Sequence, residues 1–356
     1  MKGFRTMAHR AFVWPLAIAG LLTATLRSGF TADAATRPTD EPASSALSFP
    51  TFVNLPADQA AHPGVQNEWW YVVGHLDAGG HRFGYEVQVI STTNVGGSAT
   101  PPEAEIAITD QTTGRYYTKT AAFTTAQTSF SATSLSETEP AASLRGPMHD
   151  MRLTARMPSG SIDLTLDARG PALYPDGGGL MPFLGGSSYY YSLTHIATSG
   201  TITENGRRYP VTGQSWLDHQ WGDWNWGTAL KWTWMGIQLS NGDSLNLWDI
   251  FSSGTEHTYA TVLCPDGAEK IVAVDPLKPT TSGLVTSPGT GQRYGSRWRV
   301  RVPALDATLQ VSASPRLQEI QDDGGVYEGD SDITGSFEGS PVTGQAYVEQ
   351  LGDWQP

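Results

Sequence analysis

The chain has 356 residues, of which 39% are hydrophobic, and it carries a formal net charge of −13 at pH 7. A chain this acidic repels phosphate backbones and anionic membrane surfaces, which argues against nucleic acid as a partner. The single cysteine, Cys264, excludes an intrachain disulfide, so the fold must be held together by its own packed core.

Residues 1–34 have the pattern of a secretory signal peptide. Basic residues precede an apolar run at 11–26, and an A-x-A sequence ends at Ala34. Because the run has 16 residues, against about 20 needed to span a bilayer, we expect cleavage near Ala34 and no stable membrane insertion afterwards. The expected product is secreted or periplasmic. Residues 35–50 are rich in Pro, Ser and Thr and lack periodicity, which predicts a flexible lead-in.

From residue 51 onward the sequence predicts an all-β fold. Short runs rich in β-branched and aromatic residues alternate with turn sequences such as "ENG" at 204–206 and "PDG" at 265–267. Strands at this spacing are typical of a sandwich or barrel.

A weak internal repeat suggests two similar units. Residues 69–90 and 232–253 align without gaps at an offset of 163, each as an aromatic strand, a turn and a return strand. Duplication implies two antiparallel β-barrels. We expect an N-terminal barrel at 51–215 and a C-terminal barrel at 216–356.

The segment "SWLDHQWGDWNWGTALKWTW" at 215–234 contains six tryptophans and the pair Asp218-His219. On a strand, His219 and Trp221 share one face and Asp218 points to the other, so Asp218 cannot readily orient His219. We expect most of these tryptophans to seal the junction of the two barrels. For His219 two interpretations stay open: a catalytic group beside Trp221, or a histidine that bonds a backbone carbonyl.

Acidic residues in apolar strands are the second class of candidates. Asp249 in "LNLWDIF" and Glu86 in "FGYEVQV" have apolar neighbours, and burial raises the pKa of a carboxyl group until it can act as a proton donor. The alternative is a solvated acid on a half-exposed strand. In "QNEWWYVVGHL" at 66–76, Glu68 is a further polar group that could lie inside.

Signatures of hydrolases, nucleotide sites and metal sites are missing. The sequence has no G-x-S-x-G, no phosphate-binding glycine loop and no H-E-x-x-H. The spacing of His62, His75 and His81 does not converge on one metal, so we interpret them as surface or turn histidines. We therefore expect neither a metal nor an organic cofactor.

Three stretches resemble the carotenoid 1,2-hydratase/AttH family. They are "NEWWYVVGHL", "SWLDHQWGDW" and the closing "YEGDSDITGSFEGSPVTGQAYVEQLGDW", and the similarity covers roughly 50–356. Kievitone hydratases and fungal lipocalin-like pericyclases look related. The resemblance implies two lipocalin-like (calycin) barrels, packed together, with a pocket for apolar ligands near their interface. It also implies that His219 and Trp221 match the hydratases' H-x-W element and that Asp249 matches an acidic residue, although Leu247 stands where the hydratases have tyrosine.

These observations predict a cofactor-independent enzyme that protonates a C=C bond of an apolar, isoprenoid- or polyketide-like substrate. Asp249 is the preferred acid, Asp218 a further catalytic candidate, and Trp221 a stabiliser of the resulting cation, while His219 handles water. A secreted non-catalytic binding protein is the alternative, and a secreted hydrolase the third possibility. The oligomeric state stays open. The residues expected to contact the ligand are Glu68, Trp70, Tyr71, Glu86, Trp216, Trp234 and Trp248.

Overall fold

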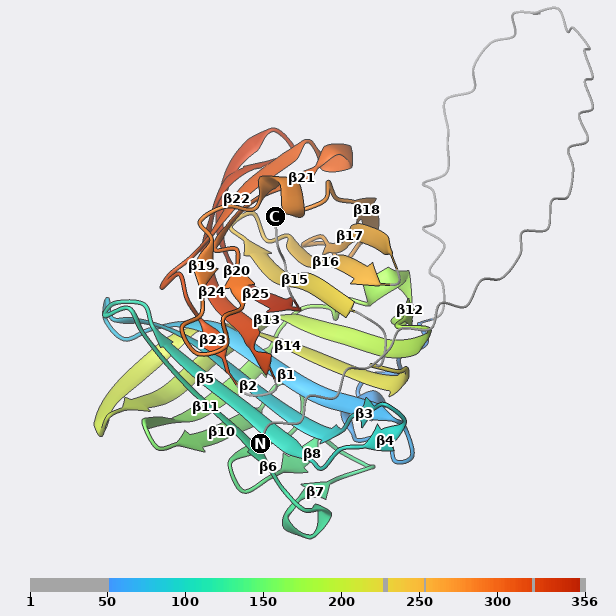
Figure 1. The fold of residues 1–356 in the computed structure, drawn as a ribbon, viewed down its shortest axis with the longest axis vertical. Helices are drawn as coiled ribbons and strands as arrows, with labels where there is room; N and C mark the ends of the chain where they lie inside the picture. Colours follow the sequence, from blue (N-terminus) through green and yellow to red (C-terminus); the bar gives the residue numbers. More distant parts are fainter. Residues whose placement is uncertain (1–50, 227–229, 253, 322–323, 353–356) are drawn as a thin grey trace, which may run out of the picture. The chain divides into compact units, whose positions relative to one another are not determined.

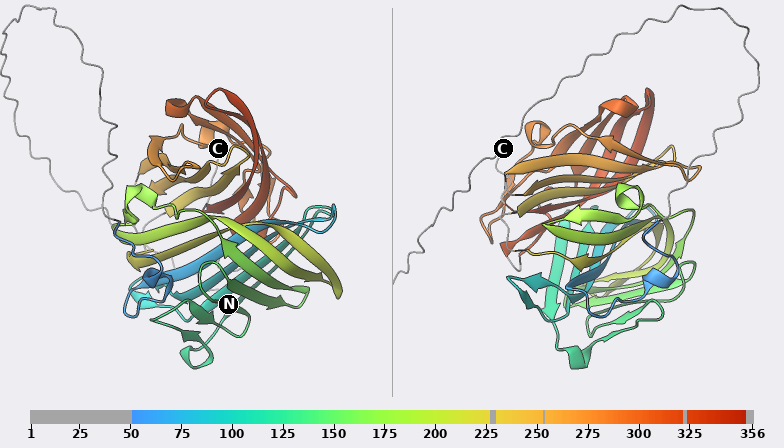
Figure 2. Two further views of the ribbon diagram at one scale, coloured as in Figure 1. Left: turned by 180° about the vertical axis from the view of Figure 1, so that it is seen from behind. Right: turned by 90° about the vertical axis from the view of Figure 1, so that its right-hand side faces the viewer.

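The computed structural model describes residues 51–226, 230–252, 254–321 and 324–352. The expected signal peptide and lead-in lie outside the described residues. Within the described part, no helix is long and apolar enough to cross a membrane. Two curled antiparallel sheets dominate the fold (Figures 1 and 2), which confirms the predicted all-β, lipocalin-like architecture.

The first sheet has twelve strands among the described residues. They are β1 (Asn67–Asp77), β2 (Arg82–Thr92), β5 (Glu103–Asp110), β6 (Arg115–Ala122), β7 (Ser129–Phe130), β8 (Ser136–Thr138), β9 (Ala142–Arg145), β10 (Met151–Met157), β11 (Gly160–Ala168), β12 (Leu180–Phe183), β13 (Gly186–Glu204) and β14 (Arg207–Asp223).

The second sheet has nine strands in the described part of the chain. They are β15 (Leu230–Leu239), β16 (Ser244–Ser252), β17 (Thr255–Leu263), β18 (Glu269–Ala273), β21 (Arg297–Val302), β22 (Ala307–Ala313), β23 (Glu319–Ile320), β24 (Val326–Phe337) and β25 (Ser340–Leu351). The short pairs are β3 (Asn94–Val95) with β4 (Ser98–Ala99), and β19 (Val285–Thr286) with β20 (Arg293–Tyr294). The 3₁₀ turns are η1 (Ala57–Gln59), η2 (Thr125–Gln127), η3 (Pro175–Gly177), η4 (Lys278–Thr280) and η5 (Pro303–Leu305).

Both sheets follow the same strand order. The first runs β6-β5-β2-β1-β14-β13-β11-β10, and the second runs β18-β17-β16-β15-β25-β24-β22-β21. In each sheet a late strand returns to pair with the first strand, so the hairpins β1–β2 and β15–β16 occupy the same place. This shared topology agrees with the repeat seen in the sequence.

The gapless alignment of the two hairpins is wrong by three residues in the return strand. Tyr71 pairs with Gln88, 17 residues later, whereas the aligned Trp234 pairs with Trp248, 14 residues later. Because side chains alternate along a strand, this odd difference reverses the face of every residue in the return strand. Glu86 and Asp249, which align in sequence, therefore point to opposite sides of their sheets.

The expected domain boundary between residues 215 and 216 falls inside β14, which continues in the first sheet to Asp223. Each sheet encloses its own apolar core, and a third apolar cluster contains residues from both sheets. Five of the tryptophans of 215–234 belong to or pack against this third cluster: Trp216, Trp224, Trp226, Trp232 and Trp234. Tryptophans from this segment therefore fill the space between the sheets.

Candidate active site

Strand β14 presents its neighbouring residues to two different compartments. Leu217 and Trp221 belong to the core of the first sheet, and Asp218 and Gln220 line a cavity that has walls from both sheets. The prediction that Asp218 and His219 point to opposite faces is confirmed, since His219 lies with the core residues.

The cavity has a volume of about 750 Å³, within the usual range for a site that encloses a small organic molecule. Strands β1, β2, β5, β12, β13 and β14 of the first sheet contribute to its wall, as do strands β15, β16, β24 and β25 of the second sheet. Its aromatic lining consists of Trp69, Tyr71, Phe183, Tyr190, Trp226, Trp232, Trp234 and Trp248.

Asp218 is an acid of this cavity that aromatic side chains hold in place. Its side chain is buried, Tyr190 donates its hydroxyl hydrogen to Oδ2 at 2.5 Å, and the Trp216 indole N–H donates to Oδ1 at 2.6 Å. Asn246 in turn donates to the Tyr190 oxygen at 2.7 Å. Burial raises the pKa of Asp218 to about 7, although these hydrogen bonds oppose the rise. A carboxyl group with this pKa exists partly as the neutral acid at neutral pH.

Two further carboxyl groups face the cavity from β24 and β25. Glu328 and Glu349 are direct cross-strand partners. Tyr71 donates to Glu328 Oε2 at 2.6 Å, and the Trp232 indole N–H donates to Glu349 Oε1 at 2.7 Å. Burial raises the pKa of Glu349 to about 7, with a contribution from the charge of Asp218. Burial and the nearby Glu349 hold the pKa of Glu328 well above its usual range.

Glu86 lies on the same side of its sheet as this cavity but does not line it. Its side chain is fully buried, and neither carboxyl oxygen has a hydrogen-bond partner among the described residues. Burial, together with the nearby Glu105 and Glu349, raises the pKa of Glu86 well above its usual value. Of the two interpretations of Glu86, the structure shows the buried acid, and its proximity helps to raise the pKa of Glu328.

The structure separates Asp249 from the aromatic cavity. On β16 the neighbouring Trp248 lines the cavity, whereas Asp249 points into the second sheet. There its carboxylate accepts hydrogen bonds from the Thr258 hydroxyl at 3.2 Å and the Leu277 backbone N–H at 2.9 Å. Burial raises the pKa of Asp249 to about 6. Asp249 is thus buried and has a raised pKa, as expected, but it does not face the cavity between the sheets.

His219 is fully buried on the inner face of the first sheet. Its Nδ1 lies 2.9 Å from the Asp58 backbone carbonyl, and its Nε2 lies 3.2 Å from Glu68 Oε1. The carbonyl contact is the one that the second interpretation of His219 expected. Although burial opposes ionisation, hydrogen bonds from His219 and His62 lower the pKa of Glu68 to about 2. Trp221 also faces inward, where it stacks on His62 at 4.1 Å.

Of the residues expected to contact a ligand, Tyr71, Trp234 and Trp248 line the cavity. Trp216 supports it indirectly through its bond to Asp218. The remaining three do not line it: Glu68, Trp70 and Glu86.

Sequence reasoning about single strands missed Tyr190, Glu328 and Glu349. Tyr190 meets Asp218 from the neighbouring strand β13, and Glu328 pairs with Glu349 across β24 and β25. Only the tertiary structure places all of them around one cavity. One sequence feature could have pointed to Glu349, namely its place in the "YVE" sequence of the closing segment. The interpretation of His62, His75 and His81 as surface or turn histidines is wrong for His75. This side chain is buried, and its Nδ1 lies 2.7 Å from Asp330 Oδ1.

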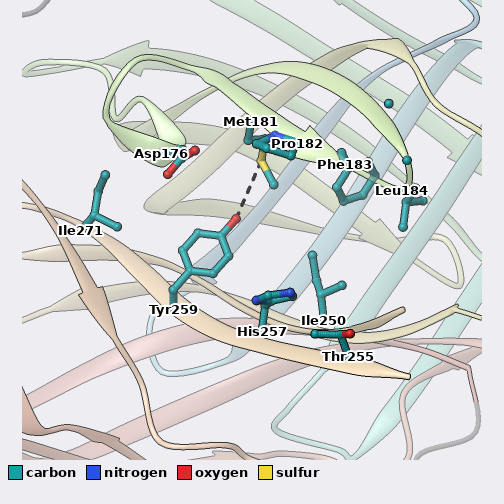
Figure 3. Close-up of a pocket in the computed structure, with 12 residues that line it drawn as sticks. Asp176, Met181, Pro182, Phe183, Leu184, Ile250, Thr255, His257, Tyr259 and Ile271 are labelled. Carbon is teal, nitrogen blue, oxygen red and sulfur yellow. Dashed lines mark hydrogen bonds between the residues drawn. The ribbon is translucent and has the colours of Figure 1, made fainter. Parts of the chain in front are cut away.

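A second cavity, of about 690 Å³, lies beside the first (Figure 3). Residues around β12 line it opposite Ile250, His257 and Tyr259 of the second sheet, and Tyr259 contacts Met181 through an O–H···S contact of 4.0 Å. Phe183 lines both cavities. The ring of Phe183 is therefore a wall shared by the two compartments.

Residues 47–353 match the family model described as AttH-like. The chain belongs to the AttH-like family. This AttH-like protein is 27% identical over 213 residues to the dehydratase asqC of Emericella nidulans, which covers 56% of the chain and 60% of that relative. It is 23% identical over 206 residues to the kievitone hydratase of Fusarium solani subsp. phaseoli, covering 55% of the chain and 58% of that relative.

The matches thus span about three fifths of the length of these two relatives. Among solved structures, an AttH protein (NE1406) from Nitrosomonas europaea superposes with a TM-score of 0.72 at 22% identity. That match covers 84% of this chain and 96% of the other. At this level of identity, the structural match supports the shared fold of this AttH-like protein.

Proposed function

We propose that this AttH-like protein is a hydro-lyase-type enzyme acting on an apolar, isoprenoid- or polyketide-like substrate in the cavity between the sheets. The observation that carries the proposal is the buried Asp218 carboxyl group, held by Tyr190 and Trp216 and facing an aromatic cavity. The names of two relatives, a dehydratase and a hydratase, support the same reaction class.

In the hydration direction, neutral Asp218 transfers its proton to one carbon of a C=C bond. The π electrons form the new C–H bond, the second carbon becomes a carbocation, and Asp218 is left as a carboxylate. The indole faces of Trp234 and Trp248 stabilise that cation, by about 0.5–2 kcal/mol for each well-placed ring. Placing the acid at Asp218 instead of Asp249 follows from the faces that the two residues occupy.

Water then forms a bond to the cationic carbon and loses a proton to a second carboxyl group. Glu349 is our candidate, because it lines the cavity and its pKa of about 7 leaves part of it ionised at neutral pH. This step was expected of His219, but His219 points away from the cavity. The product is an alcohol, and the reverse sequence is a dehydration. If water is excluded, the cation loses a proton or reacts with a second double bond, which gives isomerisation or cyclisation.

The test uses a panel of prenylated and polyketide-derived alkenes, with the matching tertiary alcohols, in water enriched in oxygen-18. A hydro-lyase incorporates one labelled oxygen into the alcohol, or releases water from the alcohol to give the alkene. A changed product without labelled oxygen would indicate isomerisation or cyclisation. Ligand binding without turnover across the panel would favour the carrier, and labelled carboxylate from an added ester would favour the hydrolase.

We also propose export of the protein, on the N-terminal sequence pattern alone. N-terminal sequencing of protein recovered outside the cytoplasm should begin at Ala35. Protein that retains Met1 and stays in the cytoplasm would contradict export.

A further inference from the structure

Three side chains inside the first sheet have the composition and spacing of a metal-binding site. His62, Glu68 and His219 each offer one ligand atom, and these atoms lie within 4.8 Å of one another. His62 Nδ1 is 2.8 Å from Glu68 Oε1, and His219 Nε2 is 3.2 Å from the same oxygen. A tetrahedral zinc ion with bonds of 2.0–2.2 Å separates its ligand atoms by about 3.3 Å. The two distances to Glu68 differ from this value by 0.1–0.5 Å.

The hydrogen-bond pattern around His219 identifies the nitrogen that would bind. Its Nδ1 faces the Asp58 carbonyl oxygen, which can only accept, so Nδ1 carries the hydrogen. Its Nε2 faces Glu68, whose oxygens already accept from the His62 backbone N–H and the Ser91 hydroxyl. A neutral His219 therefore directs a lone pair at a carboxylate. Either a second proton or a cation between the two atoms removes this conflict.

Metal-bound histidines usually donate their other N–H to an oxygen. The Asp58 backbone carbonyl, 2.9 Å from Nδ1, is this partner for His219. The Asp58 carboxylate lies 3.7 Å from His62 Nε2, within the range of an ion pair but longer than a hydrogen bond. Trp70 stacks on His219 at 4.4 Å, and Trp221 stacks on His62 at 4.1 Å. The orientation of both rings is thus fixed before any ion arrives.

We propose that His62 Nδ1, His219 Nε2 and the Glu68 carboxylate form a binding site for a zinc-type divalent ion. Two imidazoles and one carboxylate suit zinc and its neighbours among the transition metals, while magnesium and calcium prefer sites made wholly of oxygen. Three protein ligands leave the fourth tetrahedral position for water. Only the half-buried His62 connects the site with the surface, at 24% exposure of its side chain. This site is separate from the cavity between the sheets, and its existence does not depend on the proposed hydro-lyase reaction.

A second cluster, His81, Asp110 and Glu204, also has three ligand atoms within 4.8 Å. In this cluster His81 Nε2 lies 3.0 Å from Asp110 Oδ1, and Glu204 Oε1 has no hydrogen-bond partner among the described residues. This cluster therefore supplies a matched control. The variant Glu204→Gln removes one carboxylate from a histidine-containing group without touching the proposed site.

The test is a titration of the full-length, chelator-treated protein with Co²⁺, followed by visible spectroscopy, and then with Zn²⁺ in a calorimeter. We expect one equivalent of Co²⁺ to give the intense d–d absorption of a tetrahedral ion, and Zn²⁺ to displace it. An excess of Mg²⁺ should not compete. The variants Glu68→Gln and His62→Gln should lose the band, Glu204→Gln should keep it, and Asp58→Asn should weaken zinc binding about tenfold or more.

Circular dichroism of each metal-free variant shows whether it is folded. Should Glu68→Gln fail to fold, the half-exposed His62→Gln still decides the question. Absence of a stoichiometric tetrahedral Co²⁺ band in the natural protein would overturn the proposal. So would a band that persists in a folded His62→Gln variant, or one that disappears in Glu204→Gln.

Discussion

Glu328 of β24 and Glu349 of β25 lie directly opposite each other, and both side chains line the cavity between the sheets. Two ionised carboxyl groups in this position would repel each other. Each group instead accepts one hydrogen bond from an aromatic side chain, Tyr71 or Trp232. Together with Asp218 they give the cavity a set of acids of which at least one stays protonated near neutral pH, as acid–base catalysis requires.

The first prediction compares the two candidate acids. Asp218→Asn should lower turnover by about 10²–10⁴-fold and leave ligand affinity within a few fold, because the amide keeps the shape but cannot deliver a proton. Asp249→Asn should retain most of the activity, because Asp249 faces the interior of the second sheet. Steady-state kinetics on the substrate found by the labelling experiment provides the measurement. The opposite result, with Asp249→Asn inactive and Asp218→Asn active, would return the role to Asp249.

The second prediction concerns the aromatic wall. Trp248→Leu keeps an apolar side chain in the cavity but removes the π face, so kcat should fall about 2- to 30-fold, the equivalent of 0.5–2 kcal/mol of cation stabilisation. The matched variant Trp248→Phe should lose less, because it keeps an aromatic ring. Equal losses in both variants would show that Trp248 acts through its volume alone.

The third prediction is that the folded state loses stability as the pH rises from about 5 to 8. Burial raises the pKa of Asp249 to about 6 and that of Glu349 to about 7. A group whose pKa is higher in the folded state favours folding while it is protonated, and this contribution disappears as the pH passes the folded-state pKa. Chemical denaturation across this pH range should show the decline.

Glu349→Gln removes one of these titrations. At pH 8 the variant should be more stable than the natural protein by on the order of 1–3 kcal/mol, an advantage that shrinks as the pH falls and disappears below about 4, the ordinary pKa of a glutamate. Asp163→Asn, at an exposed ion pair with Arg152, should leave the pH dependence unchanged. A natural protein whose stability rises from pH 5 to 8 would contradict the assignment of buried neutral acids.

The fourth prediction tests the close approach of the two sheets. A Cβ atom at Gly84 of β2 would lie 2.3 Å from Asp330 Oδ2 of β24, and Asp330 is buried and held by His75. Gly84→Ala should therefore destabilise the protein by about 1–3 kcal/mol, the usual cost of overpacking a core. Gly178→Ala, where the new atom meets only the exposed Phe52 ring, should have little effect. A thermal midpoint that is unchanged in Gly84→Ala would mean that the sheets move apart easily.

The sequence by itself determined the all-β class, the two hairpins and the opposite directions of Asp218 and His219. These features depend on local rules: the alternation of side chains along a strand and the residues that favour turns. A resemblance carried by a few short motifs was also enough to indicate the family and the lipocalin-like fold.

Only the tertiary structure decided which acids share a cavity. The second hairpin is three residues shorter than the gapless alignment assumes, and this odd difference directs the Asp249 side chain into the second sheet. Asp218 of the first sheet meets the paired Glu328 and Glu349 of the second because side chains from both sheets line one cavity. Burial depends on that packing, and burial is what raises the pKa of these groups, so neither the site nor its acidity could be read from local sequence.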